Sequence, residues 1–226
     1  YKMSVITSKT NVYEILEDNN IFVEEDERVS PGLDDDINES NKIVITNKSV
    51  QEVQIAKISE SGIETTLDEI LKEIKVTQNI VILTHESPDG DAIGSSLAMR
   101  LMLKELEKEC DVIIPEYSRL FDFLPGIETI KKESEIKNYD LAIAVDCADI
   151  KRIAKKEYFE NAKKTIVIDH HGSNNMFGDL NYVNPVSPAC CEILAWIAEY
   201  FKMKITKELG TCIMTGIITD TGGFRH

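Results

Sequence analysis

Short apolar runs and longer amphipathic segments alternate along the chain from about residue 65 onward. The apolar runs are rich in β-branched residues, are almost unbroken by polar positions, and lie at 79–85, 111–116, 141–146 and 164–169. Such runs are typical of strands that are buried on both faces of a parallel sheet. Segments with a helical repeat of apolar residues lie at 65–78, 92–108, 188–202 and 206–218. The pattern therefore predicts an α/β fold, a doubly wound parallel sheet flanked by helices.

The first 62 residues show a different pattern. The stretch "TNVYEILEDNNIFV" has a short helical repeat at Val12, Ile15 and Leu16, "ERVSPGLDDDI" contains a Pro-Gly turn, and "NKIVITNKSVQEVQIAKI" alternates like a pair of strands. Residues 1–64 also carry 14 acidic and 6 basic side chains, whereas 65–226 carry 26 and 19. We therefore expect a small α+β module over 1–62 that precedes a larger domain over 65–226.

The composition limits the classes of function. The net charge of −15 and the pI of about 4.7 argue against binding of long duplex nucleic acid, which needs many lysine and arginine contacts to phosphate. A short anionic substrate, held locally through metal ions, remains compatible with this charge. No apolar run approaches the ~18 residues of a membrane span. Five cysteines without CxxC spacing favour reduced, buried thiols and a cytoplasmic location.

Polar residues follow three of the four apolar runs. In parallel sheets ligands bind at the carboxyl ends of the strands. Three of the four histidines lie at these positions, and two of them are adjacent in "IVIDHHGS". Two aspartates flank a glycine in "HESPDGDAIGSS", and another precedes two glycines in "GIITDTGGF". The residues expected to share this edge are His85, Asp89, Asp91, Asp146, His170, His171 and Asp220.

So much negative charge does not gather at one place without cations. Imidazole and carboxylate ligands without thiolate suit Mn²⁺, Fe²⁺ or Zn²⁺, and shared carboxylates favour two ions. The small residues Gly94, Ser95 and Ser96 would let anionic oxygens approach the amides of the following helix. A single aspartate of this kind is often only a cap or turn former, and a single buried histidine often only a core residue. The joint occurrence favours a metal site.

Other site classes have no support, because the sequence lacks the GxxxxGK[ST], strand-linked GxGxxG, HExxH and GxSxG patterns. The sequence instead resembles the DHH phosphoesterases of the bacterial oligoribonuclease and 3′-phosphoadenosine-5′-phosphate phosphatase type. The resemblance is carried by "VILTHESPDGDAIGSSLA", "LAIAVDCAD", "IVIDHHGSN" and "TGIITDTGGFR", in that order. It implies hydrolysis of short RNA oligonucleotides, dinucleotides and 3′-phosphoadenosine-5′-phosphate, with two Mn²⁺ ions and metal-activated water.

The resemblance also implies roles for individual residues. One Mn²⁺ would be held by His85, Asp89 and Asp146, and the other by Asp91, Asp146, His170 and Asp220. His171 would face the substrate phosphate, and Asp169 would orient the neighbouring imidazole, so that His171, Asp146 and Asp169 are the expected catalytic residues.

Members of this family continue into a glycine-rich C-terminal domain that holds the nucleotide, whereas this sequence stops at "GGFRH" and opens with "YKMSVITSK", which does not resemble a native start. Ser95, His171 and Arg225, with His226 as a further candidate, are then the expected substrate contacts. The alternative is a weak or inactive metal-binding fragment whose first 62 residues serve as an interaction or surface module. Those residues resemble the small repeat domains of YabE-like Gram-positive cell-wall proteins. The segment "CCEILAWIAEYF" predicts core packing or, less favoured, a homodimer face.

Overall fold

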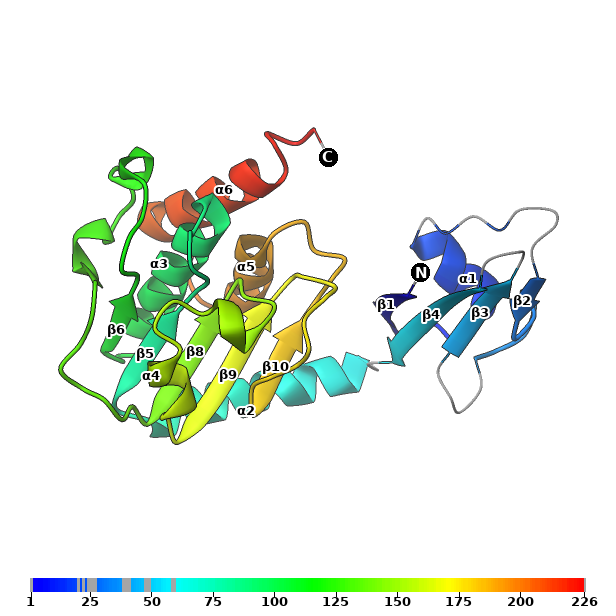
Figure 1. The fold of residues 1–226 in the computed structure, drawn as a ribbon, viewed down its shortest axis with the longest axis horizontal. Coiled ribbons are helices and arrows are strands. Elements are labelled where there is room, and N and C mark those ends of the chain that lie inside the picture. Colours follow the sequence, from blue (N-terminus) through cyan, green and yellow to red (C-terminus); the bar gives the residue numbers. More distant parts are fainter. Residues whose placement is uncertain are drawn as a thin grey trace. The chain divides into compact units, whose positions relative to one another are not determined.

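The computed structural model describes residues 2–19, 21, 23, 28–37, 42–46, 50–57 and 60–225. The chain divides into two units, Tyr1–Thr65 and Thr66–His226. Figure 1 shows their elements coloured along the sequence. Each unit is described by itself.

The first unit is a four-stranded sheet with one helix. Its elements are β1 (Lys2–Thr7), α1 (Val12–Asp18), β2 (Arg28–Ser30), β3 (Lys42–Thr46) and β4 (Val50–Lys57). The strand order is β1-β4-β3-β2, with β1 parallel to β4 and the other pairs antiparallel. The predicted helix and strand pair are confirmed, and the helical apolar residues pack against β3 in a core of Val12, Ile15, Leu16, Ile43 and Ile45. The short strand β2 and the strand β1 were not predicted.

The second unit is built on a six-stranded sheet in which every neighbouring pair is parallel. Its strands are β5 (Ile80–Leu83), β6 (Cys110–Ile113), β7 (Ile130–Lys131), β8 (Leu141–Val145), β9 (Lys164–Asp169) and β10 (Leu180–Val183). The order is β10-β9-β8-β5-β6-β7. All residues of β5 and β8 are buried, which explains their unbroken apolar sequences. The predicted α/β fold is confirmed.

Helices cover this sheet on both faces (Figure 1). The longer helices are α2 (Glu60–Val76), α3 (Gly90–Glu105), α5 (Cys190–Tyr200) and α6 (Lys207–Asp220), and α4 (Glu157–Glu160) is a single turn. Helix α3 packs against both α5 and α6, and its residues from Gly90 to Met99 are all buried, as expected for a helix enclosed by neighbours. The segment "CCEILAWIAEYF" is α5, and most of its apolar residues pack in the core as predicted.

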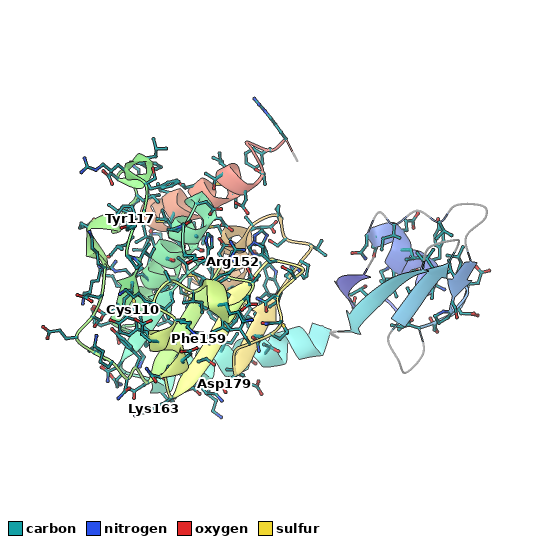
Figure 2. The ribbon with its side chains drawn as sticks, viewed as in Figure 1. Cys110, Tyr117, Arg152, Phe159, Lys163 and Asp179 are labelled. Carbon is teal, nitrogen blue, oxygen red and sulfur yellow. The ribbon has the colours of Figure 1, made fainter. Side chains whose placement is uncertain are left out.

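The face of the sheet beside α4 has its own core. Tyr139, Tyr158 and Phe159 pack there against Val81 and Ala142 of the central strands, and Phe159 is labelled in Figure 2. The described cysteines are free, and four of the five are buried, in agreement with the predicted reduced thiols. None of the helices in the described part of the chain has the length and apolar character needed to cross a lipid bilayer.

The strand order places the candidate site. Strands β5, β8 and β9 are adjacent at the centre of the sheet, and because they are parallel their carboxyl ends meet at one edge. His85 follows β5, Asp146 follows β8, and the pair His170–His171 follows β9. The N-terminus of α3 and the C-terminus of α6 reach the same edge and carry Asp91 and Asp220 respectively.

Candidate metal centre

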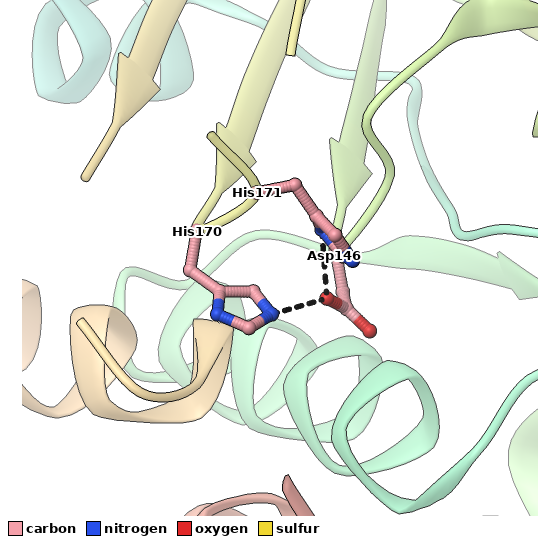
Figure 3. A group of neighbouring side chains, drawn as sticks. All are labelled: Asp146, His170 and His171. Carbon is pink, nitrogen blue, oxygen red and sulfur yellow. Dashed lines mark ion pairs between the residues drawn. The ribbon is translucent and has the colours of Figure 1, made fainter. Parts of the chain in front are cut away.

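Asp146 lies at the centre of the site. Its carboxylate is 2% exposed. Oδ2 lies 3.5 Å from His85 Nε2, and Oδ1 lies 3.4 Å from His170 Nε2 and 3.7 Å from His171 Nδ1. Figure 3 shows the two contacts to Oδ1. The backbone of Asp146 is left-handed, with φ of 52°, a conformation that is uncommon outside glycine and that collects at functional sites.

Two histidines present Nε2 to this carboxylate because Nδ1 of each faces a backbone carbonyl. The His85 Nδ1 lies 2.7 Å from the Glu86 carbonyl and the His170 Nδ1 lies 3.2 Å from the Ser187 carbonyl. A carbonyl only accepts hydrogen bonds, so Nδ1 carries the proton and Nε2 is free to bind a metal ion. Fixing the tautomer in this way is the usual arrangement around histidine ligands.

His170 Nε2 faces three carboxylates. It lies 3.4 Å from Asp146 Oδ1, 3.4 Å from Asp220 Oδ2 and 3.9 Å from Asp91 Oδ2. Burial lowers the pKa of His170, but the nearby Asp146 and Asp91 outweigh it and raise the pKa to about 9. Burial tends to raise the pKa of Asp146, and the His170 and His85 rings lower it well below its ordinary value.

Asp91 is fully buried in the first turn of α3. Its Oδ2 accepts the Cys190 N–H at 2.6 Å and its Oδ1 accepts the Cys191 N–H at 2.9 Å, so the N-terminus of α5 holds this carboxylate in place. Burial and then the neighbouring Asp146 raise the pKa of Asp91 to about 7, against the opposing hydrogen bonds from Cys191. A buried acid with so raised a pKa is a feature of functional sites.

Asp89 and Asp220 complete the acidic edge. Asp89 is the N-cap of α3, and its Oδ1 accepts the backbone N–H groups of Asp91 and Ala92, both at 3.0 Å. Asp220 is the last residue of α6. Burial raises the pKa of Asp220, and the negative charges of Asp89 and Asp146 add to the rise.

His171 differs from the other two histidines because its Nδ1 faces a carboxylate. Nδ1 lies 2.8 Å from Oδ1 of the fully buried Asp169, and this contact is the main reason why the pKa of His171 is raised. The His171 side chain is 35% exposed, and its ring lies 4.5 Å from that of His170. His171 is therefore the histidine of this group that is most open to a ligand from solvent.

The side chains form three overlapping groups. Within each group the potential ligand atoms all lie within 4.8 Å of one another. One group is His85, Asp89 and Asp146, the second is Asp91, His170 and Asp220, and the third is Asp146, His170 and His171. The first group has the composition that the family resemblance implies for one ion, and the second contains three of the four ligands implied for the other.

Two buried atoms in these groups make no hydrogen bond. Among the described residues, Asp146 Oδ1 and His170 Nε2 are buried without a hydrogen bond, and such atoms cost free energy unless something satisfies them. A divalent cation between these atoms would do so, and mixed imidazole and carboxylate donors suit Mn²⁺, Fe²⁺ and Zn²⁺. The residues present therefore fit a metal centre.

The start of α3 is closely packed. Ser95 is fully buried and its hydroxyl donates to the Ala92 carbonyl at 3.2 Å. A Cβ at Gly94 would lie 2.7 Å from the Cys212 carbonyl oxygen, so Gly94 serves close packing against α6. A substrate contact of Ser95 and the approach of an anion to this helix stay predictions.

The remaining candidates for substrate contact are the C-terminal residues Arg225 and His226. Arg225 is exposed, and its backbone N–H donates to the Thr221 carbonyl at 2.8 Å. A substrate contact of Arg225 therefore stays a prediction. His226 lies outside the described residues.

Sequence reasoning missed the residues that hold the site together from behind. Ser187 offers its carbonyl to His170, and the amides of Cys190 and Cys191 hold Asp91. A Cβ at Gly216 would lie 2.3 Å from Asp91 Oδ1, so only glycine fits there. Asn174 donates to Asp169. Of these signals, only the glycine inside the α6 pattern was visible in the sequence, where an isolated helical glycine indicates close packing.

Comparison with known proteins identifies a family and several relatives. The family model described as "DHH family, N-terminal domain" matches residues 79–217. The bifunctional oligoribonuclease and PAP phosphatase NrnA of Thermus thermophilus is 37% identical over 160 residues, which cover 70% of this chain and 47% of that protein. NrnA of Bacillus subtilis is 28% identical over 162 residues, which cover 69% of this chain and 50% of that protein.

A solved structure has the same fold. An exopolyphosphatase-related protein from Bacteroides fragilis aligns with a TM-score of 0.67 and 31% identity, over 72% of this chain and 52% of that chain. The chain thus spans about half the length of the relatives that it matches. The family model covers more than half of the chain and includes the motifs around His85, Asp146 and His170, while Asp220 lies just beyond the matched residues. The chain belongs to the DHH family of phosphoesterases.

Proposed function

We propose that residues 65–226 form the catalytic domain of a Mn²⁺-dependent phosphoesterase that hydrolyses short RNA oligonucleotides, dinucleotides and 3′-phosphoadenosine-5′-phosphate. The observation that carries the proposal is that two buried atoms, Asp146 Oδ1 and His170 Nε2, make no hydrogen bond although they face each other at 3.4 Å within the groups of potential ligands. The relatives named as oligoribonuclease and PAP phosphatase support the substrate class.

In this proposal His85, Asp89 and Asp146 would hold one ion, and Asp91, Asp146, His170 and Asp220 would hold the other. Ions bound there would lower the pKa of a coordinated water and offset the negative charge on the phosphoryl oxygens. The strongly acidic edge of the sheet, in a chain of net charge −15, would otherwise repel a phosphate.

The chain's own residues orient the reactants. Asp146 is fixed by its position after β8, and Asp91 is fixed by the two amides of α5, so the ligand oxygens need little reorganisation. His171 keeps a proton on Nδ1, which faces Asp169, and the raised pKa favours the doubly protonated ring. The exposed Nε2–H of that ring donates a hydrogen bond to a phosphoryl oxygen of the substrate.

Hydrolysis tests the proposal directly. The purified chain is incubated with Mn²⁺ and either 3′-phosphoadenosine-5′-phosphate or a ribodinucleotide, and the release of phosphate or mononucleotide is measured against an Asp146→Ala control. The proposal predicts release by the unmodified chain and not by the control. Equal release from both, or none from either, would reject the phosphoesterase activity for this chain. The second outcome would favour a metal-binding fragment whose first 62 residues serve as an interaction module.

A further inference from the structure

Asn174 contacts Asp169 and Cys147, which are the neighbours in sequence of His170 and Asp146. It follows the two histidines in the loop after β9, and its backbone N–H donates to the His171 carbonyl at 3.0 Å. Its side chain Oδ1 accepts the Met176 N–H at 2.7 Å. These two bonds fix the loop and the direction of the Asn174 amide nitrogen.

The amide nitrogen of Asn174 joins two loops of the site. Nδ2 donates to Asp169 Oδ2 at 2.7 Å and to the Cys147 carbonyl at 3.2 Å. Cys147 directly follows Asp146, so this single amide connects the loop after β8 with the loop after β9. Both of its hydrogens are used, and the assignment of its oxygen and nitrogen is fixed by the Met176 N–H.

Asp169 needs a second donor in this position. It is fully buried, its Oδ1 faces His171 Nδ1 at 2.8 Å, and its Oδ2 receives the Asn174 amide. A buried carboxylate without such donors is costly and rotates to find them. The Asn174 amide therefore holds Oδ1 in the orientation that faces the imidazole.

We propose that Asn174 is a positioning residue for His171, acting through Asp169. This inference rests on the proposed function, in which His171 contacts the substrate phosphate. Removal of the Asn174 amide leaves the metal ligands in place but lets Asp169 rotate, so that the His171 ring loses its fixed direction. Groups that orient a functional imidazole from behind typically contribute 10- to 100-fold to activity.

The chain offers a matched control. The side chain of Asn184 forms the same kind of turn, because its Oδ1 accepts the Val186 N–H at 3.2 Å. Among the described residues its amide nitrogen donates no hydrogen bond to a residue of the site. The substitutions Asn174→Ser and Asn184→Ser replace an amide with a hydroxyl, which can still form the turn at each position. Only the first substitution removes a donor to Asp169.

The first measurement requires neither metal nor substrate. Long-range ¹H–¹⁵N spectra of the metal-free protein report the protonation of each histidine ring nitrogen, and four histidines can be assigned by substitution. In the unmodified protein and in Asn184→Ser, we expect a His171 Nδ1 proton that exchanges slowly with solvent. In Asn174→Ser, and in Asp169→Asn as a reference, we expect exchange about 10-fold faster or more, as for loss of about one hydrogen bond.

The second measurement compares kcat, KM and Mn²⁺ affinity. Asn174→Ser should lower kcat about 10- to 100-fold while KM and Mn²⁺ affinity stay within about twofold, and Asn184→Ser should leave all three unchanged. An unaltered His171 signal in folded Asn174→Ser, or equal effects of the two serine variants, would overturn the inference. If Asn174→Ser does not fold, the signal of Asn174→Asp, which keeps the oxygen that accepts from Met176, decides in its place. An unmodified chain without turnover would reject the proposed function but leave the spectra as a valid test of Asn174.

Discussion

Gly216 in α6 allows Asp91 and α5 to approach the helix, and its replacement by alanine should damage the site from behind. An added Cβ would lie 2.3 Å from Asp91 Oδ1, 2.3 Å from Cys191 Sγ and 2.8 Å from Cys191 Cβ. All of these atoms belong to fully buried residues. Contacts this short cannot persist, so either Asp91 or α5 must move.

The expected cost follows from three contributions. Overpacking of a close-packed core costs about 1–3 kcal/mol. Displacement of Asp91 from the amides of α5 loses a charged hydrogen bond, at about 1.5–3 kcal/mol. Alanine gains about 1 kcal/mol over glycine in a helix interior. We therefore expect Gly216→Ala to lower the free energy of unfolding by about 1.5–5 kcal/mol.

Gly210 in the same helix provides the control. A Cβ there would meet only Ile205 Cγ2 at 3.6 Å, which is ordinary van der Waals contact. Gly210→Ala should therefore stabilise the chain by about 0.5–1 kcal/mol. The two variants make the same chemical change in one helix, and differ in what lies beside the new methyl group.

Urea unfolding followed by tryptophan fluorescence measures both variants. The single tryptophan, Trp196, lies in α5 and stacks between Tyr182 and Tyr200, so its emission reports on the unit that contains the site. Calorimetric titration with Mn²⁺ should show affinity reduced about 10- to 100-fold in Gly216→Ala and unchanged in Gly210→Ala. A Gly216→Ala variant as stable as Gly210→Ala would refute the reasoning.

Three further predictions concern residues that are not themselves candidate metal ligands. Burial tends to raise the pKa of Asp111, but hydrogen bonds from Lys131 and Tyr139 lower it below its ordinary value. The ionised carboxylate therefore stabilises the fold fully above pH ~4, and this stabilisation is lost as the pH falls further. Asp111→Asn should unfold more easily at pH 7 and lose less stability between pH ~4 and lower pH, and an unchanged loss of stability on acidification would contradict this. Lys108 Nζ donates to the carbonyl of Lys75, in the last turn of α2, at 2.7 Å, so Lys108→Met should lower the free energy of unfolding in urea by about 1 kcal/mol, and no loss would count against the contact. Burial raises the pKa of all five cysteine thiols, so a thiol reagent at neutral pH should react far more slowly with the native chain than in urea, and equal rates would disagree with the described core.

The sequence was sufficient to predict the central strands and the residues at their ends. Strands β5, β8 and β9 are buried on both faces, so their sequences are nearly pure apolar runs that stop at a polar residue. Since parallel strands end on the same edge, three separated motifs could be placed together without coordinates. Asp146, His85 and His170 follow from this argument.

Other features left too weak a pattern. Strand β7 has two residues and β10 has four, of which two are only half-buried, so neither forms a distinct apolar run. The close packing of Gly94 could not be predicted either, because its neighbour α6 is over 100 residues away in the sequence. The contacts of Asn174 and of the α5 amides depend on loop conformation, which sequence periodicity does not encode.

The adjacent histidines of "IVIDHHGS" show how both kinds of information combine. Their position after a buried strand predicted a role at the edge of the sheet. Their different partners, a Ser187 carbonyl for His170 and the Asp169 carboxylate for His171, became visible only in three dimensions. The first arrangement suits a metal ligand and the second suits a group that donates to a substrate.

The central claim is a two-ion centre that shares Asp146, and the most direct test is the number of ions bound. The purified chain is equilibrated with Mn²⁺, freed of excess ion by gel filtration, and analysed by elemental mass spectrometry beside Asp146→Ala. We expect close to two ions per unmodified chain and a marked loss in the variant. An unmodified chain that binds no ion, or an Asp146→Ala chain that retains both, would contradict it.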